Sequence, residues 1–221
     1  MPETAAPSPG QFEQAYRKLK AEGATGVLVI SLSRALSATI QSAELGARAC
    51  AGDVEVSIVD SRTVSLGTGL IIIDCAQRAA AGASLAELTA RAEELVGRTK
   101  VFGALDNLEN LKKGGRIGGA KALVASALSI KPIIEVREGK VEEGGKQRTR
   151  SKSLAFLKDV LAKNLPIESL AVLQADCDDT DDFVASLRDL YTGEIIIGDI
   201  GAVVGTHAGK GTIGIAFVTP K

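Results

Sequence analysis

The sequence predicts an α/β fold in two parts: a parallel α/β/α layer, followed by an α+β domain with a mostly antiparallel six-stranded sheet. In the first half, helical segments alternate with short apolar runs, which is the order typical of parallel α/β structure. After residue 100, short strand-like runs become more frequent, and Glu138-Gly139-Lys140 separates two of them as a hairpin turn would. We therefore expect one domain over residues 1–98 and a second over 99–221.

The first half begins with a helix whose start is marked by Ser8 and Gln11, spaced as a capping box. Ser84 and Glu87 repeat this spacing at the start of a later helix. Apolar periodicity and glycine positions predict helices over about residues 9–22, 39–52, 66–81 and 84–98, with strands over 26–31 and 54–60.

The second half contains six candidate strands, which are short apolar or alternating runs bounded by glycine and polar residues. They cover residues 101–105, 133–137, 141–147, 170–175, 194–200 and 212–218. Helices are expected around residues 108–112, 120–129, 152–163 and 181–190. From this order we expect the helices to cover one side of the sheet.

Composition excludes several classes of protein. With 26 basic and 27 acidic residues the formal net charge is −1, which argues against nucleic-acid binding and against adhesion to anionic lipid. The three cysteines include no C-x-x-C pair, so neither a disulfide framework nor a zinc site is expected. No apolar run approaches the roughly 18 residues of a membrane span. We expect a cytoplasmic protein without a cofactor, a metal or stable membrane insertion.

The segment Gly205 to Gly211 contains the one histidine of the chain and is the first candidate site. Thr206 and His207 supply a hydroxyl and an imidazole, which can bind a small polar or anionic head group. The alternative is a tight turn between two strands, in which the histidine only satisfies a backbone carbonyl. A second group of hydroxyls, from Ser33 to Thr39, follows a predicted strand and precedes a helix, where ligands of α/β sheets bind.

Several irregular motifs resemble those of the DegV family. Leu111-Lys112-Lys113-Gly114-Gly115-Arg116-Ile117-Gly118 is similar to the L-K-K-G-G-R-I-G run of that family over all eight positions. The G-T-H-x-G-x-G pattern at residues 205–211 and the L-S-x-T pattern at residues 36–39 are also similar to family motifs. The resemblance extends over essentially the whole chain.

This resemblance implies a fatty-acid-binding carrier that is not an enzyme. It implies that Thr4, Ser37 and His207, with Thr206, hold the carboxylate, while the acyl chain of a long-chain fatty acid lies between the two domains. The resemblance also implies that Arg116 lies beside the ligand. Family members present the acyl chain to a fatty-acid kinase, which is therefore an expected partner. Arg148 and Arg150 are expected at the partner, or else at a solvated strand end.

The chain departs from the family pattern at a few positions. Ala5 and Ala38 replace a serine and a glycine of the motifs, and Lys210 is expected to bring a cation near the head group. Family members usually carry a further segment ahead of the first motif, so a sheet edge is expected to be open and oligomerisation is possible.

Two other functions stay open. One is an acyl or phosphate ester hydrolase or transferase, with Ser37 as nucleophile and His207 as base, although no G-x-S-x-G motif is present. The other is an interaction module that no longer binds lipid.

Overall fold

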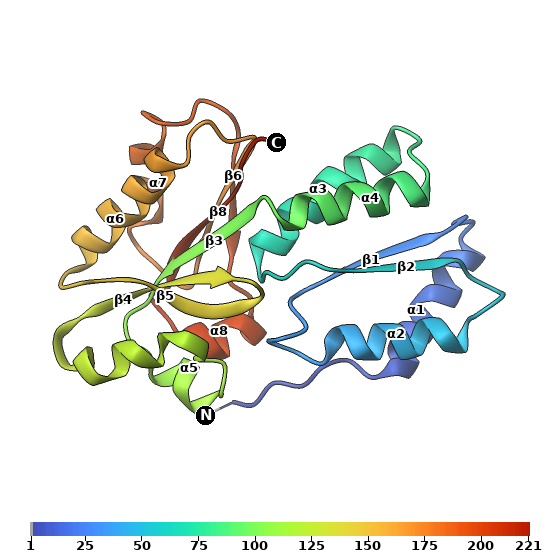
Figure 1. The fold of residues 1–221 in the computed structure, drawn as a ribbon, viewed down its shortest axis with the longest axis horizontal. Coiled ribbons are helices and arrows are strands. Elements are labelled where there is room, and N and C mark those ends of the chain that lie inside the picture. The colour runs from blue at the N-terminus through green and yellow to red at the C-terminus, as the bar shows by residue number, and fades with distance from the viewer. Residues whose placement is uncertain (1) are drawn as a thin grey trace.

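The computed structural model describes residues 2–221, apart from the side chains of residues 124–129. Its two parts lie side by side, a small three-layer unit and a larger unit built on a six-stranded sheet (Figure 1). This arrangement confirms the predicted α/β fold class. The division at residue 98 stays a prediction, because one hydrophobic cluster extends across it.

The three-layer unit is centred on two parallel strands, β1 (Val27–Ser31) and β2 (Val56–Asp60). Helices α1 (Pro9–Ala21) and α2 (Thr39–Ala49) cover one face, and helices α3 (Leu66–Ala80) and α4 (Leu85–Val96) cover the other (Figure 1). Both capping boxes are confirmed: the hydroxyls of Ser8 and Ser84 accept from the backbone at the third helical position, and the side chains there bond back.

The larger sheet has the strand order β5-β4-β3-β8-β6-β7. All neighbouring pairs are antiparallel except β6 and β7, so the predicted mostly antiparallel six-stranded sheet is confirmed. Its strands are β3 (Thr99–Ala104), β4 (Lys131–Arg137), β5 (Lys140–Gln147), β6 (Ser169–Gln174), β7 (Ile195–Asp199) and β8 (Ile213–Val218). The remaining helices are α5 (Glu109–Lys113), a 3-10 helix (Gly118–Ser129), α6 (Arg150–Lys163), α7 (Thr180–Leu187) and α8 (Ala202–Ala208).

Strands β4 and β5 form the predicted hairpin, with Glu138 and Gly139 as its two turn residues. Their φ angles are 49° and 76°, as a type I′ turn requires at both positions. The tip of this hairpin touches the other unit, because the Ser33 hydroxyl donates to the Gly139 carbonyl at 2.6 Å. Arg62 and Glu138 form an exposed ion pair at 3.3 Å beside this hydrogen bond.

The expectation that helices cover one side of the sheet was wrong, because both faces are covered. Helices α6 and α7 pack on one face, where Leu157 and Phe183 join Phe217 of β8. Helix α3 packs on the other face, where Ile71 joins Ala216. The physical reason is visible in β8, whose six residues are all buried, since a strand that is apolar on both faces needs cover on both.

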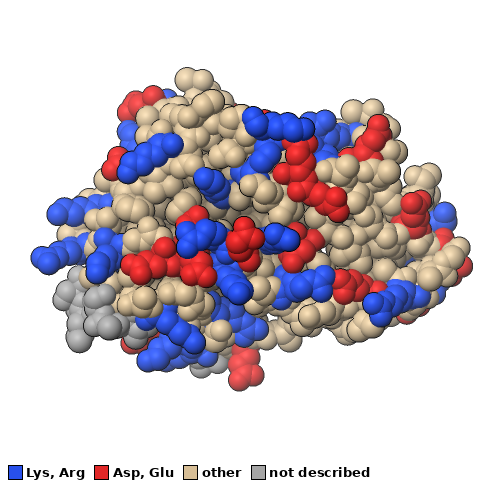
Figure 2. Space-filling view, viewed as in Figure 1, with Lys and Arg blue, Asp and Glu red and all other residues tan. Residues whose placement is uncertain are grey.

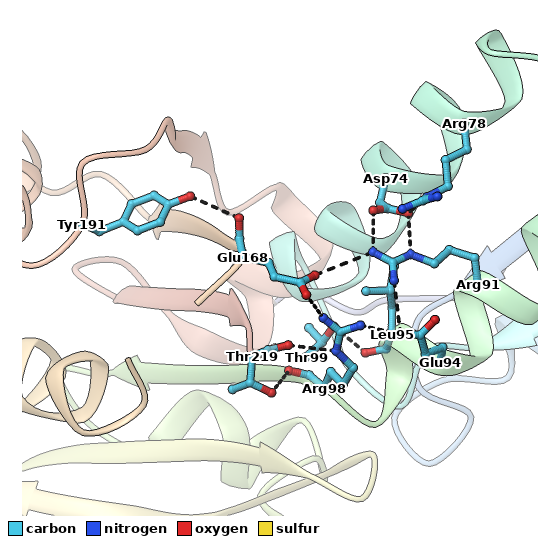
Figure 3. A network of polar contacts seen from close by, with 10 residues as sticks. All are labelled: Asp74, Arg78, Arg91, Glu94, Leu95, Arg98, Thr99, Glu168, Tyr191 and Thr219. Carbon is cyan, nitrogen blue, oxygen red and sulfur yellow. Dashed lines mark hydrogen bonds and ion pairs between the residues drawn. The ribbon is translucent and has the colours of Figure 1, made fainter. Parts of the chain in front are cut away.

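A network of ion pairs reinforces the junction between α4 and β3 (Figure 3). Arg98 pairs with Glu94 on α4 and with Glu168 ahead of β6, and its Nε donates to the Thr219 carbonyl at 2.8 Å. Arg91 forms two hydrogen bonds to Asp74 on α3, at 2.9 and 3.0 Å. These contacts connect the helices of the first unit to the end of the chain.

In the described part of the chain, no helix combines the length and the apolar character that crossing a membrane requires.

Candidate functional site

A cavity of about 460 Å³ lies between the two units. Its walls come from the segment before α1, the loop between β1 and α2, the hairpin β4–β5 and helix α8. Most of these walls are apolar, and they include Leu32, Leu36, Val64, Leu111, Ile134, Val136, Val141, Val203 and Val204. Thr4, Ser37, Arg116 and His207 line the same cavity, so the structure brings together four of the five residues expected to hold the ligand.

The segment around His207 is not the turn between two strands considered above. Residues 202–208 form the short helix α8, which follows β7, and His207 lies in its last turn. Gly201 is the N-cap of this helix, which packs against α5. Valines, glycine and threonine are weak helix formers, so helix propensity gives little signal for this segment, and its position against α5 supplies the stabilisation.

Thr4 and His207 are in direct contact although they lie at opposite ends of the chain. The distance between Thr4 Oγ1 and His207 Nε2 is 2.9 Å, and both side chains are partly buried. Burial lowers the pKa of His207 from the usual 6.5, and the positive charge of Arg116 lowers it further. The imidazole is therefore neutral near pH 7, so one ring nitrogen carries a proton and the other does not.

The ring of His207 lies against the backbone of Gly114. A Cβ atom added to Gly114 would lie 2.2 Å from His207 Nδ1, well inside van der Waals contact. Nδ1 is buried and has no hydrogen-bond partner in the described part of the chain. Gly114 belongs to the L-K-K-G-G-R-I-G run, so this run contributes the close packing that fixes the imidazole.

Ser37 and Thr39 form a pair of hydroxyls at the start of α2. Their oxygens lie 2.8 Å apart, and the Thr39 amide donates to Ser37 Oγ at 3.3 Å. Ser37 is half-buried in the cavity wall. The two hydroxyls and the adjacent helix start give the cavity a second group of donors.

Arg116 lies at the mouth of the cavity and is exposed. Its Nε donates to the Leu36 carbonyl at 3.2 Å, and its Nη1 donates to the Gly114 carbonyl at 2.7 Å. These bonds connect the loop that carries Ser37 to the loop beneath His207. Arg116 also lines a second, polar pocket together with Lys113, Thr4 and His207.

Thr206 does not line the apolar cavity. It faces the polar pocket, and its hydroxyl donates to the Ala202 carbonyl at 2.8 Å within α8. Lys210 does not approach the head-group residues as expected, because its ammonium pairs with Asp176 at 2.5 Å and the side chain is 79% exposed.

The two arginines expected at a partner differ in their surroundings. Arg148 is exposed. Arg150 is partly buried and makes two hydrogen bonds of 2.8 Å to Asp179 and one of 2.5 Å to the Gly211 carbonyl. The guanidinium of Arg150 thus fixes the loop that follows α8. A partner role for the pair stays a prediction.

Sequence reasoning did not identify the apolar wall of the site. Ile134, Val136 and Val141 occur in ordinary strand patterns, which give no sign that these strands face a cavity. Only the hairpin prediction pointed to their pairing.

The chain matches known proteins over nearly its whole length. A family model described as "Uncharacterised protein, DegV family" matches residues 1–220. The chain belongs to the DegV family. A DegV domain-containing protein from Deinococcus radiodurans is 36% identical over 223 residues, covering 98% of this chain and 78% of the relative. One from Streptomyces coelicolor is 33% identical over 217 residues, covering 96% and 76%.

Solved DegV structures have the same fold. A DegV family protein from Thermus thermophilus, described as binding fatty acid, is 35% identical and superimposes with a TM-score of 0.88 over 100% of this chain and 80% of that chain. A Thermotoga maritima protein described as revealing a fatty-acid-binding function is 28% identical, with a TM-score of 0.85 over 99% and 78%.

Proposed function

We propose that this DegV protein is a fatty-acid-binding carrier, in which Thr4, Ser37 and His207 hold the carboxylate and the acyl chain fills the apolar cavity. The observation that carries the proposal is the contact between Thr4 and His207 at the polar side of a cavity whose other walls are apolar. The fatty-acid binding described for the Thermus and Thermotoga relatives supports the same ligand class.

The head-group chemistry suits a carboxylate. A hydroxyl and a neutral imidazole donate to it without the desolvation cost of a buried permanent cation. The positive charge of Arg116 favours the anion from the cavity mouth, where the side chain is exposed to solvent. His207 Nε2 contacts Thr4 and is the ring nitrogen that takes part in this exchange of hydrogen bonds, whereas Nδ1 is buried against Gly114.

The acyl chain supplies most of the affinity. At about 0.8 kcal/mol per methylene, a chain of about fifteen methylenes contributes roughly 12 kcal/mol before the cost of ordering it. Hydrogen bonds at the head group then fix its orientation and contribute less.

Binding is favoured over hydrolysis. Ser37 Oγ is paired with Thr39, and the contact of His207 Nε2 is with Thr4. A nucleophile and base need a hydrogen bond to each other and a group that orients the base. Within the described side chains, no carboxylate bonds to His207 Nδ1. An interaction module without a ligand is also less favoured, because the cavity is apolar and large enough for an acyl chain.

A partner kinase would reach the carboxylate through the polar pocket lined by Lys113, Arg116 and Thr206. Both cations of this pocket are exposed, which suits the transfer of a phosphoryl group to a carboxylate oxygen. Arg148 is the arginine proposed to contact the partner, because Arg150 is engaged within the chain.

The test is native mass spectrometry of protein purified from cells, followed by organic extraction of what it carries. A stoichiometric fatty acid that is lost from the His207→Ala variant supports the proposal. A folded protein that is empty and does not bind added fatty acid contradicts it. Replacing Ser37 by Ala should weaken retention in a carrier, whereas it would abolish turnover in an enzyme.

A further inference from the structure

A polar cleft of about 780 Å³, separate from the polar pocket beside His207, also lies between the two units. It is bounded by the end of β2, the end of α4, the start of β3 and strand β4. Charged side chains of both signs line it, namely Arg34, Asp60, Arg62, Glu93, Lys100 and Glu135, with Arg137 and Glu138 at the hairpin. Acidic and basic groups are interspersed across the middle of the face in Figure 2, over the hairpin and the strands beside it.

Val136 lines both this cleft and the apolar cavity of the proposed fatty-acid site. No other residue of the described chain is common to the two linings. The head-group residues Thr4, Arg116 and His207 are instead shared with the polar pocket described above. The apolar cavity is therefore bordered by polar spaces at two places, the head group and Val136.

The backbone around Val136 is held firmly. Val136 lies opposite Val101 on β3 and opposite Val141 on β5, so strand β4 is paired on both sides. Its side chain is 7% exposed and belongs to the hydrophobic cluster beneath α3. The hairpin tip beyond it is fixed to the other unit by the bond from Ser33 to Gly139. This wall cannot retreat without breaking sheet pairing or that bond.

On the basis of the proposed function, we infer that Val136 is a specificity-determining residue that closes the acyl cavity against the polar cleft and limits the ligand to chains with an apolar end. A cavity of about 460 Å³ is in the size range that takes a ligand as large as a fatty acid. With the head group at the polar border formed by Thr4, Arg116 and His207, we place the methyl end of the chain against Val136, at the other border. A polar group at that end would be buried without a hydrogen-bond partner.

The test compares binding of hexadecanoic acid with that of 16-hydroxyhexadecanoic acid by delipidated protein. Wild type is expected to bind the hydroxylated acid about tenfold more weakly or worse, because its terminal hydroxyl is unsatisfied. Val136→Ala removes two methyl groups from the wall and lets the hydroxyl reach the wet cleft, so this penalty should fall to about threefold or less. Val141→Ala is the matched control, because Val141 lines only the apolar cavity. This control should keep the penalty.

Val136→Ile provides the opposite change and covers the case in which Val136→Ala does not fold. The added methyl group should shift the optimum of a saturated chain-length series to shorter acids. If wild type binds hexadecanoic acid but the penalty is unchanged in Val136→Ala, or the optimum is unchanged in Val136→Ile, the inference is overturned and the carrier function stands. If wild type binds neither acid, the carrier function itself fails.

Discussion

The tightest packing in the site is between Gly114 and His207, and it gives the sharpest prediction. In Gly114→Ala, the new Cβ would lie 2.2 Å from Nδ1 and 2.8 Å from Cε1 of the imidazole, so the ring must retreat by about 0.8 Å to reach a separation that real Cβ atoms adopt. The backbone of Gly114 is in the right-handed helical region, with φ −77° and ψ −4°, so alanine itself is not strained there. The effect must then come through His207.

A displacement of this size is large for the 2.9 Å contact between Thr4 Oγ1 and His207 Nε2, so the imidazole cannot keep its present hydrogen-bond geometry. A hydrogen bond to a charged group contributes about 1.5–3 kcal/mol, so we expect fatty acid to bind Gly114→Ala roughly 10- to 150-fold more weakly. Displacement of a fluorescent fatty-acid analogue measures this change, and thermal unfolding checks that the variant is folded.

Gly205→Ala is the matched control, because Gly205 lies on α8 two residues before His207. An added Cβ there meets nothing closer than 3.7 Å, and alanine favours the helix. Affinity in this control should stay within about twofold of wild type. Wild-type affinity in a folded Gly114→Ala would refute the argument that this glycine positions the imidazole.

Three further predictions concern protonation, the ion-pair network and the hairpin tip. The pKa of His207 is lowered in the folded chain, so as the pH falls the unfolded protein binds the proton before the folded protein does. The stability of the unliganded protein should therefore fall as the pH is lowered from about 7 through the unfolded pKa near 6.5. Thermal unfolding measured over this pH range should show a weaker dependence in His207→Gln. The side chain of Arg98 is 11% exposed, so Arg98→Ala should lower the free energy of unfolding in urea by about 3 kcal/mol. The carboxylate of Glu168 is 42% exposed, so Glu168→Gln should lower it by less than about 1 kcal/mol. Equal losses in the two variants would contradict the role of burial. Ser33→Ala leaves the buried Gly139 carbonyl without its donor and should cost about 1–3 kcal/mol, whereas Ser151→Ala, at an exposed hydroxyl, should be near neutral in the same measurement.

Local rules in the sequence predicted those elements that depend on local chemistry. Ser8 and Ser84 predict the starts of their helices because a capping box is formed within four residues. The turn at Glu138 and Gly139 was predictable because glycine between two apolar runs favours a hairpin. Helix α8 was not, because seven residues are too few to show a helical period and its stabilising contacts come from α5.

In the candidate site too, some features could be predicted from local sequence and others depend on tertiary contacts. Its polar members were identified through motifs whose resemblance to the DegV family covers Ser37, Arg116 and His207. The contact between Thr4 and His207 joins residues 203 positions apart, and no periodicity or spacing encodes such a pair. The apolar wall depends on the strand order of the sheet, which is decided by packing over the whole chain.

Helix α3 has an energetic consequence for the whole molecule. Ile71 and Leu70 share one hydrophobic cluster with Val59 of β2 and with Ala216 of β8, so neither unit can lose its structure without exposing apolar surface of the other. We therefore expect heat to melt both units in a single cooperative transition, with equal calorimetric and van 't Hoff enthalpies. A molecule held between the units would raise that one melting temperature, and so protect residues far from any it touches.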